Sequence, residues 1–180
     1  MLTKTLATLL LLTVATLADG FQTAGEWVKY APEDSRFSAL FPQQPKVSST
    51  PGTSDSGDKL TKHIAQVIDA SGSVYVLGFT DYQYPLDPQK SLDGARDKSI
   101  QSMKATLLRE SSITLDGNAG REYMASIKVE GFDGLILART YVVGGRLYMI
   151  MYGYQKSLDP ETAARNTAKF FDSFKLSADK

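Results

Sequence analysis

Cysteine is absent from the 180 residues of the chain. The protein therefore has no disulfide, no thiolate nucleophile, no cysteine metal ligand and no thiol for lipid attachment. Histidine occurs once, as His63. Lys and Arg number 20, and so do Asp and Glu, which leaves no excess charge that would attract a nucleic acid. Packing alone must hold the fold together, and a chain of this length can bury a sufficient core.

The first eighteen residues differ from the rest of the chain. Lys4 is their only charge, and the segment continues as LATLLLLTVATLA. A charged start, a short apolar run and small residues at its end are typical of a secretory signal peptide, whereas a membrane span needs about 20 apolar residues. We predict a signal peptide over 1–18, cleaved after Ala18 or alternatively after Gly20. An uncleaved anchor or a buried helix are the other interpretations. The domain 19–180 is then soluble in the periplasm or outside the cell, without stable membrane insertion.

Strands are predicted in the first half of the domain by residues of alternating polarity. The stretch 37–41 alternates and ends at a proline, which indicates a short strand. The runs 60–68 and 73–82 flank the turn sequence DASG and predict a β-hairpin, whose second strand is apolar on both faces. Between these elements, 47–59 is rich in Ser, Thr, Gly and Pro. We predict a flexible loop there, either a plain connection or a binding loop.

A seven-residue sequence occurs twice with five identical positions, as YQYPLDP at 82–88 and as YQKSLDP at 154–160. In each copy the aspartate, Asp87 or Asp159, can cap a helix and the following proline suits its first position. We interpret both copies as the end of a hairpin and the start of an amphipathic helix, rather than as a repeated functional site. The positions predicted to face the core on these helices are Leu92, Ala95, Ser99, Met103 and Leu107, then Ala163, Thr167, Phe170 and Phe174.

Further strands are predicted between the two helices. The DGNAG sequence within 113–131 resembles a glycine-rich phosphate loop, but period-two alternation follows it, and a phosphate loop requires a helix. The segment 135–154 predicts a second hairpin around Gly144 and Gly145. The expected order is β-β-β-β-α-β-β-β-β-α. This order predicts a single α+β domain in which two amphipathic helices flank an antiparallel sheet.

Four stretches carry a family resemblance: FSALFPQQP, LDGNAGREY, ARTYVVGGRLYMIMY and FFDSFKL. In this order, over about residues 27–176, the chain resembles the PsbP-like group of small secreted α+β domains. The resemblance implies an antiparallel sheet flanked by helices and an accessory, non-catalytic character. The family is named for an extrinsic subunit of the photosynthetic oxygen-evolving complex, and many secreted bacterial relatives have no established role. No residue here matches a motif that would imply manganese, calcium or photosystem binding.

Aromatic residues of the second hairpin are candidates for a binding surface. Tyr148, Tyr152 and Tyr154 share one face of a predicted strand with Ile150, while Arg139 and Tyr141 share a face of the partner strand. Such a surface can bind a partner or ligand, or it can pack beneath a helix with its hydroxyls at the rim. The candidate surface consists of Arg139, Tyr141, Tyr148 and Tyr152.

His63 is the residue on which hydrolase chemistry would depend. Ser and Asp are plentiful enough for a Ser-His-Asp triad, but the chain contains no G-x-S-x-G sequence. Alternation places His63 on one strand face with Ala65 and Val67. The other interpretation is a strand histidine with a satisfied hydrogen bond.

Four aspartates gather near the first predicted helix and could in principle hold Ca²⁺. Their spacing does not match an EF-hand loop, and one is already explained as a helix cap, so we expect no metal and no cofactor. The four are Asp81, Asp87, Asp93 and Asp97.

Three functions follow from these observations. The first is an exported, non-enzymatic accessory or binding protein with an unknown protein or small-molecule partner. The second is a carrier of a small apolar or lipid-like ligand between sheet and helix. The third is a hydrolase that uses His63. For the carrier, the residues expected to line the cavity are Met103, Leu107, Met149 and Met151.

Overall fold

The computed structural model describes residues 26–33, 36–54, 57–129 and 132–177. The predicted signal peptide and both cleavage positions lie outside these ranges. Within them, the body of the fold is a seven-stranded antiparallel sheet. Its strands are β3 (Lys46–Thr53), β4 (Lys59–Ile68), β5 (Val74–Asp81), β6 (Thr106–Leu115), β7 (Asn118–Val129), β8 (Phe132–Val143) and β9 (Arg146–Gln155).

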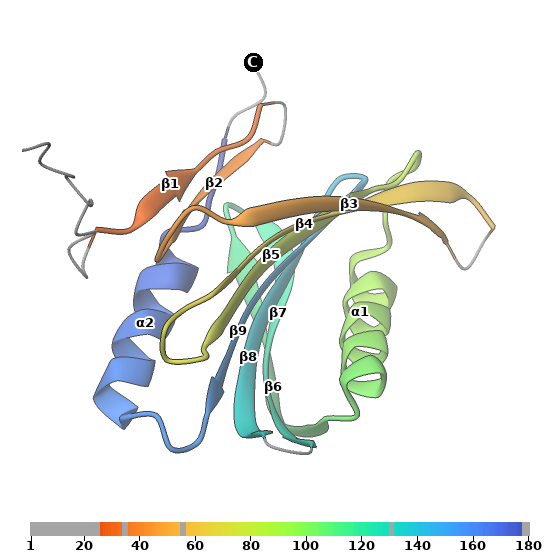
Figure 1. Ribbon diagram of the computed structural model, residues 1–180. Helices are drawn as coiled ribbons and strands as arrows, with labels where there is room; N and C mark the ends of the chain where they lie inside the picture. The colour runs from red at the N-terminus through yellow and green to blue at the C-terminus, as the bar shows by residue number, and fades with distance from the viewer. Residues whose placement is uncertain (1–25, 34–35, 55–56, 130–131, 178–180) are drawn as a thin grey trace, which may run out of the picture.

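The strands of the main sheet follow the spatial order β3-β4-β5-β9-β8-β7-β6. A second, three-stranded sheet has the order β1-β2-β10, from β1 (Val28–Tyr30), β2 (Phe37–Phe41) and β10 (Lys175–Leu176). Helices α1 (Pro88–Met103) and α2 (Pro160–Asp172) lie on opposite sides of the main sheet, with the small sheet next to α2 (Figure 1). The predicted α+β class and both predicted hairpins are confirmed.

Both copies of the repeated sequence begin a helix, as predicted. The side chain of Asp87 accepts a hydrogen bond from the backbone N–H of Lys90 at 2.8 Å, and Asp159 accepts one from Thr162 at 2.8 Å. A proline follows each cap at the first helical position. The aspartates satisfy amide groups that the first turn of a helix leaves without partners.

The first copy also holds the turn of the second hairpin in place. The backbone N–H of Tyr82 donates to the carbonyl of Gly145 at 2.8 Å, and that of Leu86 donates to Gly144 at 3.1 Å. A β-carbon at position 145 would lie 2.8 Å from the carbonyl oxygen of Tyr82. Glycine at this turn therefore allows the connection to α1 to pack against it, which the turn sequence alone did not indicate.

Helix α1 ends earlier than its apolar periodicity predicts. The helix stops at Met103, where Lys104 takes a left-handed φ of 51° and its N–H bonds to Gln101. Leu107, predicted on the helix, lies on β6 instead. Helical spacing and strand alternation both accommodate an apolar residue at this position, so periodicity alone extended the helix too far.

The segment 47–59 was wrongly predicted to be a flexible loop. Its first half belongs to β3, which pairs with β4 from Lys46 opposite Gln66 to Thr53 opposite Lys59. The strand lies at the edge of the sheet and is exposed at nearly every position, so it has no apolar alternation to recognise. Ser and Thr suit such an exposed edge, and an edge strand tolerates Pro51, which lacks an amide hydrogen.

The DGNAG sequence forms a hairpin turn, so its interpretation as something other than a phosphate loop is confirmed. Asp116 and Gly117 both have positive φ, 50° and 78°, as a two-residue type I′ turn requires. They join β6 to β7. The predicted alternation after the turn is also confirmed, because Tyr123 and Ala125 are buried on one face of β7.

The main core lies on the face of the sheet that α2 and the small sheet cover, which we call the α2 face. Aromatic residues dominate it, and many of their rings meet edge to face, as Tyr75 and Phe170 do at 5.3 Å. Alternate residues point to the opposite α1 face, where Leu92 of α1 and Tyr123 are buried. Adjacent residues of β5, Tyr75 and Val76, are both buried, so this strand, whose sequence is apolar on both faces, is covered on both sides.

Candidate binding groove

The three tyrosines of the predicted binding surface lie inside the core. Tyr141, Tyr148 and Tyr152 are 5%, 1% and 0% exposed. The Tyr141 ring stacks on Phe174 at 6.0 Å between centroids, and Tyr148 meets the same phenylalanine at 5.5 Å. Of the two interpretations drawn from the sequence, packing beneath a helix describes these side chains. Arg139, the fourth candidate, has a side chain that is 28% exposed and remains accessible.

A groove with a volume of about 530 Å³ lies between α2 and the strands β8 and β9. Leu135 and Leu137 form its wall on the sheet, and small residues form the wall on the helix. These small residues leave space between the helix and the sheet, whereas Phe170 and Phe171 of the same helix are buried in the core. The helix wall and its approach consist of Leu158, Pro160, Ala163, Ala164, Thr167 and Ala168.

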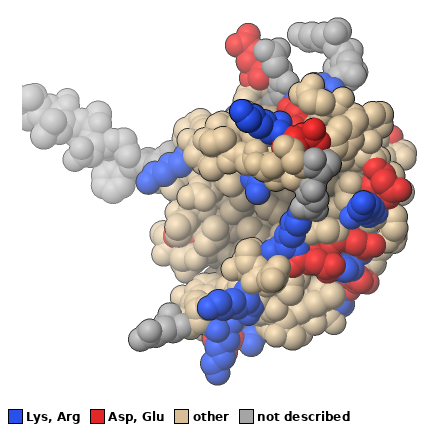
Figure 2. All heavy atoms as spheres, turned by 90° about the vertical axis from the view of Figure 1, so that its right-hand side faces the viewer, with Lys and Arg blue, Asp and Glu red and all other residues tan. Residues whose placement is uncertain are grey.

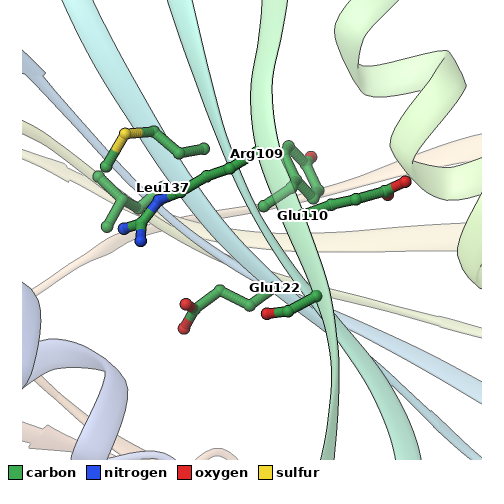
Figure 3. A pocket seen from close by; sticks show the side chains of 7 residues that line it. Arg109, Glu110, Glu122 and Leu137 are labelled. Carbon is green, nitrogen blue, oxygen red and sulfur yellow. The ribbon is translucent and has the colours of Figure 1, made fainter.

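A smaller hollow of about 160 Å³ adjoins this groove, because Leu137 lines both. Arg109 of β6 extends across the sheet toward Leu137, and Glu122 of β7 also projects from the sheet nearby (Figure 3). Strand pairing explains the arrangement: Arg109 lies opposite Met124, which lies opposite Leu137. Residues of three neighbouring strands thus share one face. Neither Arg109 nor Glu122 was singled out from the sequence, which contains no signal for this juxtaposition.

Most charged side chains in the groove are paired. Arg139 donates to Glu122 at 2.7 Å and to Asp172 at 3.3 Å, and its guanidinium lies 5.0 Å from the Phe171 ring centroid. Burial opposes the charge of Arg139, but the bonds to Glu122 outweigh it and raise the arginine pKa. Lys156 is 2.6 Å from Asp133, and this hydrogen bond lowers the pKa of Asp133.

His63 has the hydrogen bond that its structural interpretation requires. Its Nδ1 lies 2.9 Å from Oγ of Ser49, and its ring stacks on Phe79 at 4.5 Å with an interplanar angle of 14°. Among the hydrogen bonds of the described residues, none joins His63 to a carboxylate. Ser49 lies on the exposed edge strand β3, and its role was not foreseen because that segment was expected to be a loop.

Each of the four aspartates singled out from the sequence has a hydrogen-bond or ion-pair partner, and Asp93 and Asp97 both pair with Arg96. Asp81 accepts from Arg146 at 2.6 Å on each oxygen, and Asp87 caps α1. Asp93 pairs with Arg121, while Asp97 is 2.8 Å from Arg96. In the described part of the chain, no group of three or more His, Asp or Glu side chains is placed to hold a metal ion.

Charges are mixed on the side of the molecule that carries α1 (Figure 2). Lys, Arg, Asp and Glu side chains are interspersed there. Part of this mixed surface is a charged cluster in which Glu110 lies 2.6 Å from Arg96 and 3.3 Å from Arg121. This cluster joins α1 to β6 and β7, so its role in the fold is to attach the helix to the sheet.

The methionines expected to line a carrier cavity do not line either hollow. Met149 alternates with the buried tyrosines of β9 and therefore faces α1, where its sulfur lies 3.7 Å from Oγ of Ser99. Met151 follows the same alternation, and Leu107 is exposed on β6. The groove involves the other helix and the other face of the sheet. Sequence periodicity identifies the two faces but does not show which helix leaves space.

Comparisons with known proteins support the fold. No known sequence family matches the chain, and a search of curated proteins found no relative. The solution structure of cyanobacterial PsbP (CyanoP) from Synechocystis sp. PCC 6803 is similar, with a TM-score of 0.58 over 87% of this chain and 95% of that one. The chain has a PsbP-like fold. Its sequence identity to that protein is 12%, so the likeness concerns the fold alone.

A second similar structure is a protein of unknown function, PA94, from Pseudomonas aeruginosa. It is 13% identical, covers 81% of this chain and 95% of its own, and has a TM-score of 0.38. The PsbP-like resemblance predicted from the order of four motifs is confirmed at the level of the fold. Among the described residues, none forms a helix with the length and apolar character needed to cross a membrane.

Proposed function

We propose that the mature protein is an exported, non-catalytic binding protein that holds a small ligand in the groove between α2 and strands β8 and β9. The groove carries this proposal. Its volume of about 530 Å³ falls in the range of about 300–1,000 Å³ that is usual for small-molecule sites. Its lining combines apolar walls with a few polar groups, as such sites generally do.

The chemistry of the lining supports binding rather than catalysis. Arg139 is held between two carboxylates, and the hydroxyl of Thr167 donates to the carbonyl of Ala163 at 2.7 Å. A hydrolase would need a nucleophile next to a base, and neither histidine nor serine is among the residues that line the groove. His63 and its partner Ser49 lie on β4 and β3, and β5 separates them from β9, the nearer of the two groove strands. The groove and the histidine are therefore separate features.

Export is supported by the sequence of the N-terminal segment. Lys4 followed by a short apolar run meets the criteria for a signal peptide. A domain without cysteine folds without an oxidising environment and also tolerates one. The proposal of an accessory role outside the cytoplasm agrees with the PsbP-like fold.

Native mass spectrometry of protein purified from its own exported fraction tests this function. We expect the wild-type protein to carry a reproducible additional mass of a few hundred daltons, on the scale that the groove volume admits. Replacing Ala164 with tryptophan should fill the groove and remove that mass. Ala70→Trp, in the exposed turn between β4 and β5, is the matched control and should retain it.

Two results would contradict the proposal. One is an additional mass that survives in Ala164→Trp, because the ligand would then lie elsewhere. The other is a wild-type protein that carries no additional mass in any preparation, which would favour a protein partner. The same spectra give the mass of the mature chain and show whether cleavage follows Ala18 or Gly20.

A further inference from the structure

Among the described residues that line the groove and the adjoining hollow, one cation has no ion-pair partner. Arg139 is shared by Glu122 and Asp172, and Lys156 is paired with Asp133. The side chain of Arg109, in contrast, makes no ion pair or hydrogen bond within the described residues. Glu110, its neighbour in sequence, points to the α1 face, where Arg96 and Arg121 hold it.

Arg109 lies where it can serve an occupant of the groove. Its guanidinium extends over the sheet toward Leu137, the residue that lines both hollows (Figure 3). Met124 lies beside it on β7, opposite in the strand register. Arg109 is exposed on β6, so an anion in the hollow can reach its guanidinium from solvent and is attracted by its charge.

A hydrogen-bond donor in the groove is close enough to Arg109 to be affected by its charge. Tyr154 lines the larger hollow, and its hydroxyl makes no hydrogen bond with the residues that the structure describes. Burial raises the pKa of this tyrosine, and the charge of the neighbouring Tyr152 adds to the effect, while the charge of Arg109 opposes it. The phenol is thus protonated at neutral pH and lies within the field of the arginine.

The rest of the groove is suited to an apolar body. Leu135 and Leu137 line one side, and the alanine side chains of α2 line the other. None of these groups offers a hydrogen bond. An occupant that fills this part gains mainly by removing apolar surface from water, at about 25 cal/mol per Å².

We propose that the ligand is a small amphipathic carboxylic acid, with its apolar body between Leu137 and the alanine wall of α2 and its carboxylate held by Arg109 and the hydroxyl of Tyr154. This inference rests on the proposed function and specifies its ligand class. Guanidinium and carboxylate match in geometry and in charge. A doubly charged phosphate suits the site less, because Glu122 lies in the same hollow.

Isothermal titration calorimetry with three probes of equal chain length tests the inference: decanoic acid, decanol and decyl phosphate. We expect the wild-type protein to bind decanoic acid at least about tenfold more tightly than either other probe, as a charge-assisted contact provides. Arg109→Gln should remove that preference while leaving the affinity for decanol unchanged. Arg165→Gln, on α2 but outside the groove lining, is the matched control and should behave as wild type.

The outcomes separate this inference from the proposed function. If decanoic acid and decanol bind equally well and Ala164→Trp abolishes both, the groove is the ligand site, but it does not recognise a carboxylate. Tighter binding of decyl phosphate would also overturn it. So would a failure of decanoic acid to bind, whatever the native mass spectra show about the occupancy of the groove. A preference for decanoic acid that persists in Arg109→Gln would show that this arginine does not bind the carboxylate.

Discussion

Buried polar side chains of the sheet differ in whether their polar atoms have hydrogen-bond partners. The side chain of Arg146 is 7% exposed, donates to both oxygens of Asp81 and lies 4.4 Å from the Phe79 ring centroid. Thr140 is 1% exposed, and its hydroxyl oxygen makes no hydrogen bond with the described residues. A buried hydroxyl without a partner reduces stability, because it has lost its water without gaining a substitute.

We predict that Thr140→Val increases the free energy of unfolding by about 1 kcal/mol, since valine has a similar shape and no polar atom. Urea denaturation of the purified domain measures the change. Thr114→Val, at an exposed position on the edge strand β6, should alter stability by less than about 0.5 kcal/mol. A clear loss of stability in Thr140→Val would mean that the hydroxyl has a partner, such as a bound water.

At the scale of elements, each helix begins at an aspartate whose carboxylate accepts a hydrogen bond from a backbone N–H of the first turn. Asp159 accepts the N–H of Thr162, and this backbone hydrogen bond, together with one from the Thr162 side chain, lowers the pKa of the carboxyl from its usual value of 3.8. The pKa of this aspartate is thus lower in the folded than in the unfolded chain. Its contribution to stability is complete above the unfolded-state pKa and is lost as the pH falls through the folded-state pKa.

We predict that Asp159→Asn makes stability less dependent on pH in the acid range. Asparagine also caps helices well, so the variant should unfold near the wild-type midpoint at neutral pH. Between about pH 5 and about pH 2 the wild-type protein should lose more stability than the variant, since only the wild type has this carboxylate to protonate. Urea midpoints across that range measure the effect. Parallel curves for the two proteins would contradict it, and Glu33→Gln, an exposed carboxyl, is the control.

On the scale of the whole molecule, one aromatic cluster joins the two sheets and α2. Phe174 follows α2, is 3% exposed and contacts Phe37 of the small sheet at 5.8 Å between ring centroids. On its other side it meets Tyr141 and Tyr148 of the main sheet. Further along the chain, β10 pairs with β2, so the C-terminal segment completes the small sheet.

Phe174→Ala should reduce the free energy of unfolding by about 3–5 kcal/mol, because it removes a buried ring and leaves a cavity between the layers. A domain of this size has a total stability of about 5–15 kcal/mol, so the variant should be only marginally folded. Guanidinium denaturation at low temperature measures the loss. The control is Ile68→Ala, where the side chain is 60% exposed and removal should have little effect. A small loss for Phe174→Ala would mean that the two sheets are stable independently.

Much of the fold could be predicted because its cues are local. A cap such as Asp87 acts within three residues, and the Gly144–Gly145 turn joins strands that are adjacent in sequence. Alternation placed Tyr148 and Tyr152 on one face, which is correct. The errors arose where local cues were ambiguous: β3 has no apolar alternation at an exposed edge, and Leu107 suits helix and strand spacing equally.

The candidate site depended on the tertiary structure. The sequence by itself determined the elements, their faces and the α+β class, because caps, turns and alternation act over a few residues. It did not determine that α2 covers the tyrosines and leaves a groove beside Leu137, or that Arg109 of β6 lines the hollow that adjoins this groove. These features result from the order in which distant strands pair and from the side chains that meet across the layers, and both emerge only when the whole chain is packed.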